Sequence, residues 1–154
     1  PLSALLAAGA VAMATMAFVV PKFMAIWTIP LLANAEATGG TGAEMAAMLL
    51  PLLNVSIPFS LYTSFDYMGF WLYALFAVLT MRSLYASDGL SRVIAVLVGL
   101  FGVGFHAALA CLLLGVIQAP DIEISFGVSF IPLLLLVLIL PFAFWRDLKQ
   151  APTI

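Results

Sequence analysis

The chain has 154 residues, of which 66% are apolar and 8% are charged, and its formal net charge is −2. An ordinary soluble domain is about 45–50% apolar and about 25% charged, and a domain this small leaves much of its surface exposed. The composition therefore excludes a soluble globule and predicts an all-α integral membrane protein. The small net charge and the lack of a basic stripe exclude nucleic acid as a partner.

Long apolar segments predict a bundle of four transmembrane helices, with residues 1–154 forming a single transmembrane domain. The first segment, residues 2–20, carries no charge and is about long enough to cross the hydrocarbon. Pro21 and Lys22 follow, and the apolar run then resumes to residue 33. The first helix therefore either extends to 33 with a kink at the proline, or ends before an interfacial segment. The other spans are expected at residues 67–85, 93–117 and 126–145.

The region between the first two spans, residues 34–66, has a different character. It begins with the most polar stretch of the chain, where three glycines indicate a loop. The residues that follow are apolar in part, but Pro51 and Pro58 divide them into pieces too short to cross a membrane. We therefore expect an interfacial or re-entrant segment between helices 1 and 2.

The charges predict an orientation. Four of the five basic residues follow span two or span four, two places that an even number of crossings separates. Most of the acidic residues lie on the opposite side. The positive-inside rule then puts both termini on the cytoplasmic-equivalent side of a bacterial inner membrane or an organelle membrane, with residues 34–66 outside. Lys22 is the one basic residue that does not follow this pattern.

His106 is the only histidine and lies near the middle of the third span. Small residues line up with it at helical spacing and form one face, the kind of seam that lets helices approach closely in lipid. His106 is therefore expected to face another helix, where three roles stay open. It donates an interhelical hydrogen bond, relays protons, or ligates a haem or chlorophyll for which Gly102 leaves room. The seam consists of Ala95, Gly99, Gly102, His106 and Ala110.

Lys22 and Asp66 form the second candidate site. A lysine at the end of an apolar run extends to the headgroup region or pairs with a carboxylate. Asp66 begins the second span on the same outer side and is the natural partner. The pair acts either as an interfacial anchor or as a buried ion pair in a path for substrate or protons.

Sequence motifs for catalysis and metal binding are absent. The chain has no HExxH, no GxSxG and no lysine in a glycine-rich phosphate loop. Its single cysteine, Cys111, excludes an internal disulfide and a CxxC site. We therefore predict no catalytic residue and no metal site.

Three classes of function are consistent with these features. The first is a non-catalytic accessory or structural subunit of a larger membrane complex, for instance a respiratory or photosynthetic one. It is favoured by the scarcity of polar groups and by a second small-residue face at Ser3, Ala7, Ala10 and Ala14. The second is a small transporter, channel or lipid-handling protein that uses the Lys22–Asp66 pair. The third is a tetrapyrrole-binding redox protein centred on His106. Bound lipids and other membrane subunits are the expected partners.

Overall fold

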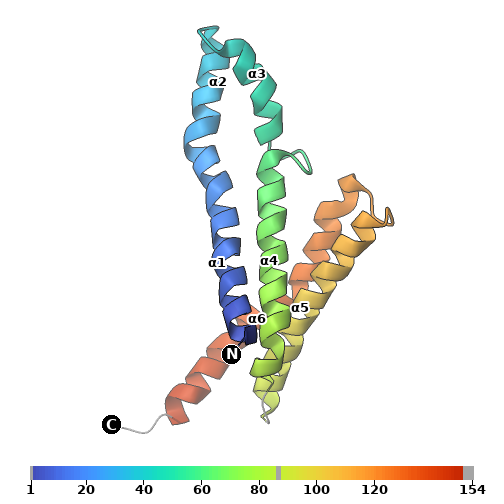
Figure 1. Cartoon of the computed structure of the whole chain (residues 1–154). Helices are drawn as coiled ribbons and strands as arrows, with labels where there is room; N and C mark the ends of the chain where they lie inside the picture. Colours follow the sequence, from blue (N-terminus) through green and yellow to red (C-terminus); the bar gives the residue numbers. More distant parts are fainter. Residues whose placement is uncertain (1, 86–87, 151–154) are drawn as a thin grey trace. The chain divides into compact units, whose positions relative to one another are not determined.

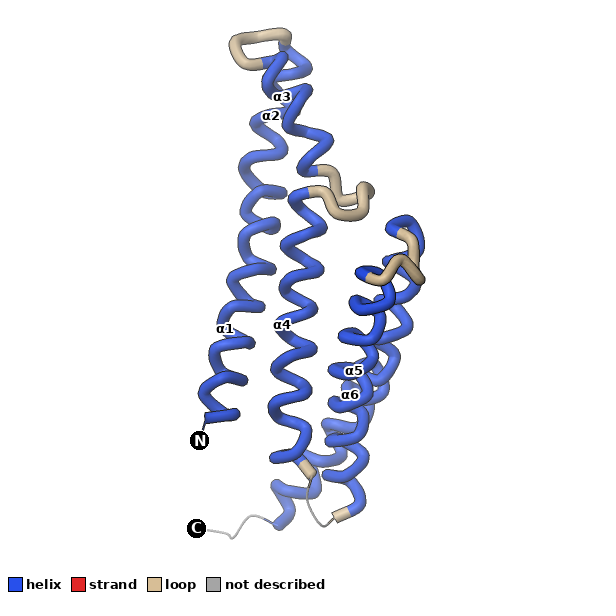
Figure 2. The backbone as a smooth tube through the Cα atoms, turned by 45° about the vertical axis from the view of Figure 1, so that its right-hand side comes forward, coloured by secondary structure: helices blue, strands red, loops and turns tan. Residues whose placement is uncertain are grey.

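A computed structural model describes residues 2–85 and 88–150, and within them every regular element is a helix (Figures 1 and 2). The prediction of an all-α fold is therefore confirmed. Four helical segments are long and apolar enough to cross a membrane: Leu2–Thr38, Leu61–Leu84, Gly89–Leu113 and Ala119–Arg146. The chain divides into two compact units, one formed by Gly9–Tyr73 and the other by the residues before and after that range. A single transmembrane domain stays a prediction.

The first helical segment runs without a break through α1 (Leu2–Phe23), η1 (Met24–Thr28) and α2 (Ile29–Thr38). Of the two alternatives for the first helix, the structure has the extended one. Pro21 lies inside the helix, and the irregular turn comes after it, where η1 is π-helical and the Ile29 N–H bonds to the Met24 carbonyl. Pro30 explains the turn, because a proline ring clashes with the carbonyl four residues earlier and the wider π register relieves that clash.

A tight turn reverses the chain after α2. Gly39 has a φ of 64° and ends the helix, with its N–H bonded to the Glu36 carbonyl. The short helices α3 (Ala43–Leu49) and η2 (Leu50–Leu53) then run back beside α2 (Figure 1). Neither is long enough to cross the hydrocarbon, for which about 20 residues are needed.

The helix α4 (Leu61–Leu84) begins earlier than the expected start at residue 67. Two polar residues, Ser60 and Thr63, cap its first turn. The Ser60 Oγ accepts a hydrogen bond of 3.2 Å from the Thr63 N–H, and the Thr63 hydroxyl donates to the Ile57 carbonyl at 3.0 Å. These bonds satisfy backbone groups that a helix end otherwise leaves free.

The second unit contains α5 (Gly89–Leu113) and α6 (Ile122–Gln150), linked through the short helix η3 (Ala119–Asp121). Asp88 caps α5, since its carboxylate accepts from the Ser91 N–H at 2.9 Å. Pro132 and Pro141 are accommodated inside α6 without ending it.

Phenylalanine rings hold α5 and α6 together as an antiparallel hairpin (Figures 1 and 2). The rings of Phe105 and Phe126 lie 4.4 Å apart, and those of Phe101 and Phe130 lie 5.6 Å apart. Phe101 and Phe105 are among the most deeply buried side chains of the protein. This aromatic cluster, which the sequence reading did not identify, forms the core of the hairpin.

Candidate functional site

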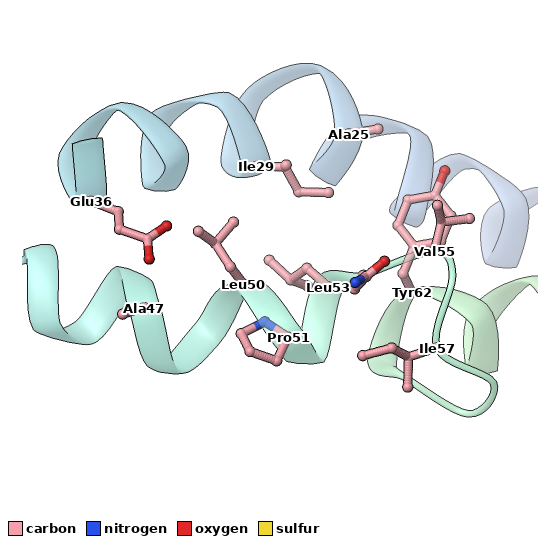
Figure 3. A pocket seen from close by; sticks show the side chains of 11 residues that line it. Ala25, Ile29, Glu36, Ala47, Leu50, Pro51, Leu53, Val55, Ile57 and Tyr62 are labelled. Atoms are coloured by element: carbon pink, nitrogen blue, oxygen red, sulfur yellow. The ribbon is translucent and has the colours of Figure 1, made fainter.

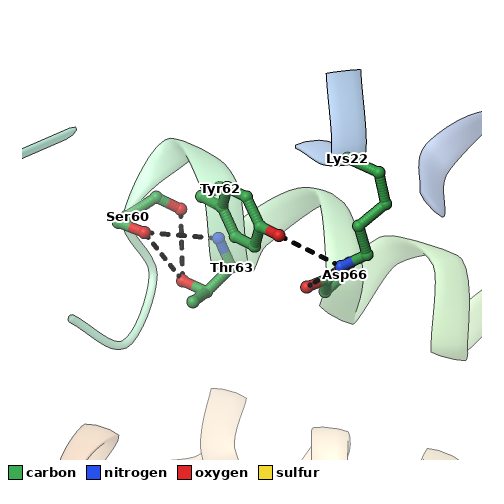
Figure 4. Close-up of polar contacts among 5 residues, drawn as sticks. All are labelled: Lys22, Ser60, Tyr62, Thr63 and Asp66. Carbon is green, nitrogen blue, oxygen red and sulfur yellow. Dashed lines mark hydrogen bonds and ion pairs between the residues drawn. The ribbon is translucent and has the colours of Figure 1, made fainter. Parts of the chain in front are cut away.

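The structure brings Lys22 and Asp66 together within the Gly9–Tyr73 unit (Figure 4). The Lys22 Nζ lies 3.2 Å from the Asp66 Oδ1 and donates a second hydrogen bond of 3.2 Å to the Tyr62 hydroxyl. The ammonium also lies 5.0 Å from the centre of the Tyr62 ring. Tyr62 was missed by the sequence reading. Its position one helical turn before Asp66 is the signal that identifies it, because residues four apart share a helix face.

The three side chains differ in exposure. Tyr62 is buried, the Asp66 side chain is 19% exposed, and the Lys22 side chain is 55% exposed. The lysine therefore reaches outward along α1 toward a carboxylate that α4 holds in place. The charged end of the lysine stays accessible while its contacts with Tyr62 and Asp66 hold it against α4.

Gly69 lets α1 pack closely against α4, and this close packing places Lys22 opposite Asp66. Phe18 lies one turn before Lys22, and its ring occupies the space above Gly69, where an added Cβ would come within 2.8 Å of the ring. The Phe18 ring also makes an edge contact with Phe70, with centroids 4.8 Å apart. The fit of Phe18 over Gly69 thus fixes the register of α1 against the start of α4.

Irregular backbone lies close to the pair on both chain segments. On one side the π-helical η1 begins at Met24, just after Lys22. On the other side residues 54–60 separate η2 from α4, and Phe59 has a positive φ of 60°. Departures from regular helix of this kind occur often at functional sites.

A cavity of about 640 Å³ opens between α2 and the α3–η2 segment (Figure 3). Its walls are mainly apolar, with Glu36 toward the α2–α3 turn and Tyr62 at the opposite end. Asn54 also lines it. Tyr62 therefore belongs both to the cavity wall and to the cluster around Lys22. The apolar lining includes Ala25, Ile29, Leu50, Leu53 and Ile57. Such a cavity can hold an apolar group and contact it with a few polar atoms.

His106 lies in the other unit, half-buried on α5. Its Nδ1 lies 2.7 Å from the Gly102 carbonyl, one turn earlier on the same helix. A carbonyl only accepts, so the Nδ1 carries the proton in this bond. The hydrogen bond seen here thus stays within α5, whereas a hydrogen bond to a neighbouring helix is one of the three roles that the sequence leaves open.

The space beside Gly102 is filled by residues of α4, which packs against α5 at this point. A Cβ added there would lie 2.8 Å from the Val78 Cγ2 and 3.0 Å from the Ala74 carbonyl oxygen, both on α4. The α4 backbone therefore occupies the space that a flat macrocycle would need beside Gly102. Gly99 continues this contact, since its Cβ would lie 3.2 Å from the Met81 sulfur. Ala95, Gly99 and Gly102 are buried, whereas Ala110 is exposed.

An ion pair joins two segments that the sequence reading did not connect. The Arg146 guanidinium, near the end of α6, donates to the Asp88 carboxylate at the start of α5. The Ser91 backbone N–H, the Ser91 hydroxyl and this guanidinium hold the pKa of the Asp88 carboxyl well below its usual range. The ends of α4 and α6 thus lie on the same side of their unit.

Among the residues that the structure describes, no group of three or more His, Cys, Asp and Glu side chains lies together as a metal site would require. The chain matches no protein-family model, no curated protein and no solved structure. Over residues 2–85 and 88–150 the fold is all-helical, with four helices long and apolar enough to cross a membrane. Its function is argued from geometry alone.

Proposed function

We propose that the chain is a membrane-embedded, non-catalytic subunit of a larger membrane complex. One feature carries the proposal, namely residues 24–60, which we call the hairpin arm. The arm comprises η1, α2, α3, η2 and the turns between them. Many of its large apolar side chains are exposed, and the length of the first helical segment supports a position of the arm beyond the hydrocarbon.

Helix length supports this placement. The first helical segment has 37 residues, which at 1.5 Å per residue is about 55 Å long, whereas the hydrocarbon core is about 30 Å thick. A charged pair is least costly at the boundary between hydrocarbon and headgroups. With Lys22 and Asp66 at that boundary, residues 2–21 and the body of α4 lie in the hydrocarbon. The hairpin arm then projects from it.

The exposed side chains of the arm support a protein partner. Leu31 is 68% exposed and Met48 is 76% exposed, and Ile26, Trp27 and Met45 are exposed in the same way. A patch of this kind outside lipid marks an interaction surface, because monomeric proteins rarely leave one uncovered. A neighbouring subunit that covers the arm removes this apolar surface from water.

The small-residue face of the first helix gives no support for a partner subunit. Ala7, Ala10 and Ala14 are 3%, 5% and 0% exposed, so the chain already buries this face itself. The sequence reading had counted it as a face in need of a partner. The proposal therefore relies on the hairpin arm.

Site-specific photo-crosslinking in the native membrane tests the proposal. A photoreactive residue at Met48 is expected to give one discrete protein adduct, and Met45→Glu in the same chain is expected to remove it. The matched control is a photoreactive residue at Leu134 on α6, which is 66% exposed and placed by the proposal against lipid. A Met48 probe that labels only lipid would show that the arm lies along the membrane surface, and would contradict the proposal.

A second function, a small transporter or lipid-handling protein, is favoured by the Lys22–Asp66–Tyr62 cluster. The cluster lies between two irregular backbone segments and adjoins the cavity at Tyr62. Irregular backbone at membrane depth often lines a cavity or a path. In proteoliposomes loaded with a pH-sensitive dye, this function predicts a proton flux that Asp66→Asn abolishes and Glu36→Gln does not. No flux in the wild type would contradict a proton path.

A redox role for His106 receives no support from Gly102, because α4 fills the space beside that residue. A visible absorption band in the purified protein that His106→Leu removes would restore the tetrapyrrole hypothesis.

A further inference from the structure

We propose that the groove between the end of α4 and the start of α5 binds an anionic phospholipid. This inference relies on the membrane placement proposed above, but not on the hairpin arm. The groove has a volume of about 680 Å³ and lies within one unit of the structure. Its walls are formed by Met81, Arg82, Tyr85, Ala95, Val96, Gly99, Leu100 and Val103.

The groove is lined mainly by apolar side chains. Val96, Leu100 and Val103 of α5 contribute exposed side chains to it, and Met81 of α4 lines it beside Gly99. The α5 residues from Ala95 to Val103 extend over about 12 Å at 1.5 Å per residue. This is most of one leaflet, whose hydrocarbon is about 15 Å thick, half of the roughly 30 Å core. The length therefore suits one acyl chain.

The polar end of the groove carries positive charge. Arg82 lines it directly, and Arg92 lies over the ring of Tyr85, with its Cζ 5.8 Å from the centroid. No acidic side chain lines the groove. The nearest acid in the turn, Asp88, caps α5 and pairs with Arg146. A ligand with an apolar chain and an anionic headgroup therefore matches the groove at both ends.

The bilayer supplies this ligand. The positive-inside rule places the turn between α4 and α5 at the cytoplasmic leaflet, where anionic lipids are concentrated. A phosphate there accepts hydrogen bonds from guanidinium groups and from the Tyr85 hydroxyl. A neutral zwitterionic lipid offers the same chain and phosphate but no net negative charge, so the groove is expected to prefer the anionic one.

Native mass spectrometry of the whole chain tests the inference with phosphatidylglycerol and phosphatidylcholine of identical acyl chains. Phosphatidylglycerol is expected to bind as one tight adduct, and phosphatidylcholine more weakly. Arg82→Gln is expected to weaken phosphatidylglycerol binding about fivefold, the usual effect of one basic residue at an anionic surface. Lys149→Gln is the matched control, since Lys149 lies at the same end of the unit but at Trp145 and not in the groove.

A second pair of variants tests the apolar end. Val103→Trp fills the groove and is expected to displace the lipid, whereas Val137→Trp on α6, at a position 64% exposed, is not expected to displace it.

The inference is overturned if both lipids bind equally, or if Lys149→Gln weakens binding as much as Arg82→Gln. A lipid-free dimer that cross-links through Leu100→Cys would assign the groove to a second copy and overturn it too. Extraction of the chain by alkaline carbonate would separately contradict the membrane placement.

Discussion

The Lys22 Nζ lies 3.2 Å from the Asp66 Oδ1, although the two residues are 44 positions apart in the chain. Their pairing depends on the close contact of Phe18, one turn before Lys22 on α1, with Gly69, one turn after Asp66 on α4. The ammonium is the more exposed member, and Tyr62 supplies a second acceptor for it. The pair therefore consists of an exposed lysine side chain and a carboxylate that is more buried.

This asymmetry predicts unequal effects of substitution at the two positions. Lys22→Met leaves the partly enclosed Asp66 carboxylate without its cation, whereas Asp66→Asn leaves a lysine that can turn to the headgroups. We expect Lys22→Met to lower the free energy of unfolding more than Asp66→Asn. The coupling energy in a double-mutant cycle is expected to be below about 1 kcal/mol, as for exposed ion pairs.

Reversible unfolding in detergent micelles measures both quantities. Lys22→Arg is the control, because it keeps the charge and the reach of the side chain. A coupling of several kcal/mol would contradict an exposed interfacial anchor and favour an ion pair buried in the membrane.

Glycines on α5 differ in what surrounds them, and this predicts opposite effects of the same substitution. At Gly102 a Cβ would meet the Ala74 carbonyl oxygen at 3.0 Å, and backbone cannot move aside as a flexible side chain can. Gly102→Ala is therefore expected to cost about 1–3 kcal/mol through overpacking. At Gly104 the nearest atom is the Ser129 Oγ at 3.8 Å, an ordinary contact. Gly104→Ala is expected to be neutral or to stabilise by up to about 1 kcal/mol, because alanine favours helix.

Thermal unfolding of the two variants side by side is the measurement, with monodisperse elution as a check on assembly. Equal effects of the two substitutions would contradict the close contact between α4 and α5 at Gly102. Gly99→Ala is expected to fall between them, since its neighbour at 3.2 Å is the flexible side chain of Met81.

Some of these features were accessible from the sequence. Apolar runs long enough to cross a membrane predict the four helices, because only lipid accommodates so much apolar surface. The pairing of Lys22 with Asp66 follows from the cost of an isolated charge at the end of an apolar run. Both inferences use strong physical constraints that act on single residues or short runs.

Other features depend on contacts between distant segments, and periodicity carries no information about them. The bond between Asp88 and Arg146 joins residues 58 positions apart. The fit of α4 against Gly102 decides that this glycine serves packing, although a glycine beside a histidine is equally compatible with a macrocycle. The early start of α4 arises from the caps at Ser60 and Thr63, whose hydrogen bonds satisfy backbone groups of its first turn.

The lowered pKa of Asp88 predicts how stability changes with pH. A carboxyl whose pKa is depressed in the folded state stabilises that state above its unfolded pKa, and this contribution is lost as the pH falls. We expect Asp88→Asn to lower the melting temperature at pH 7, because it removes the charge that pairs with Arg146. The difference from wild type is expected to shrink below about pH 4, where the unfolded carboxyl takes up its proton.

Asparagine retains the ability to cap α5, so this variant separates the ion pair from the cap. Asp88→Ala removes both and is expected to lower the melting temperature further at pH 7. A melting-temperature difference for Asp88→Asn that is constant from pH 7 to pH 3 would show that the charge of Asp88 does not contribute.

The proposed topology predicts that the hairpin arm and the end of α6 lie on opposite sides of the membrane. The physical reason is the distribution of basic residues. The Asp88–Arg146 bond also brings the start of α5 and the end of α6, which both carry basic residues, to one side of their unit.

Single cysteines at Thr41 and at Lys149, introduced into a Cys111→Ala chain, report the two sides through a membrane-impermeant maleimide. Both positions are exposed in the structure. We expect intact cells or sealed vesicles to label Thr41→Cys from outside, and Lys149→Cys only after the membrane is opened. The proposal has three crossings between Thr41 and Lys149, formed by α4, α5 and α6. Labelling of both positions from the same side would require an even number of crossings, and would contradict the placement of the arm beyond the outer boundary.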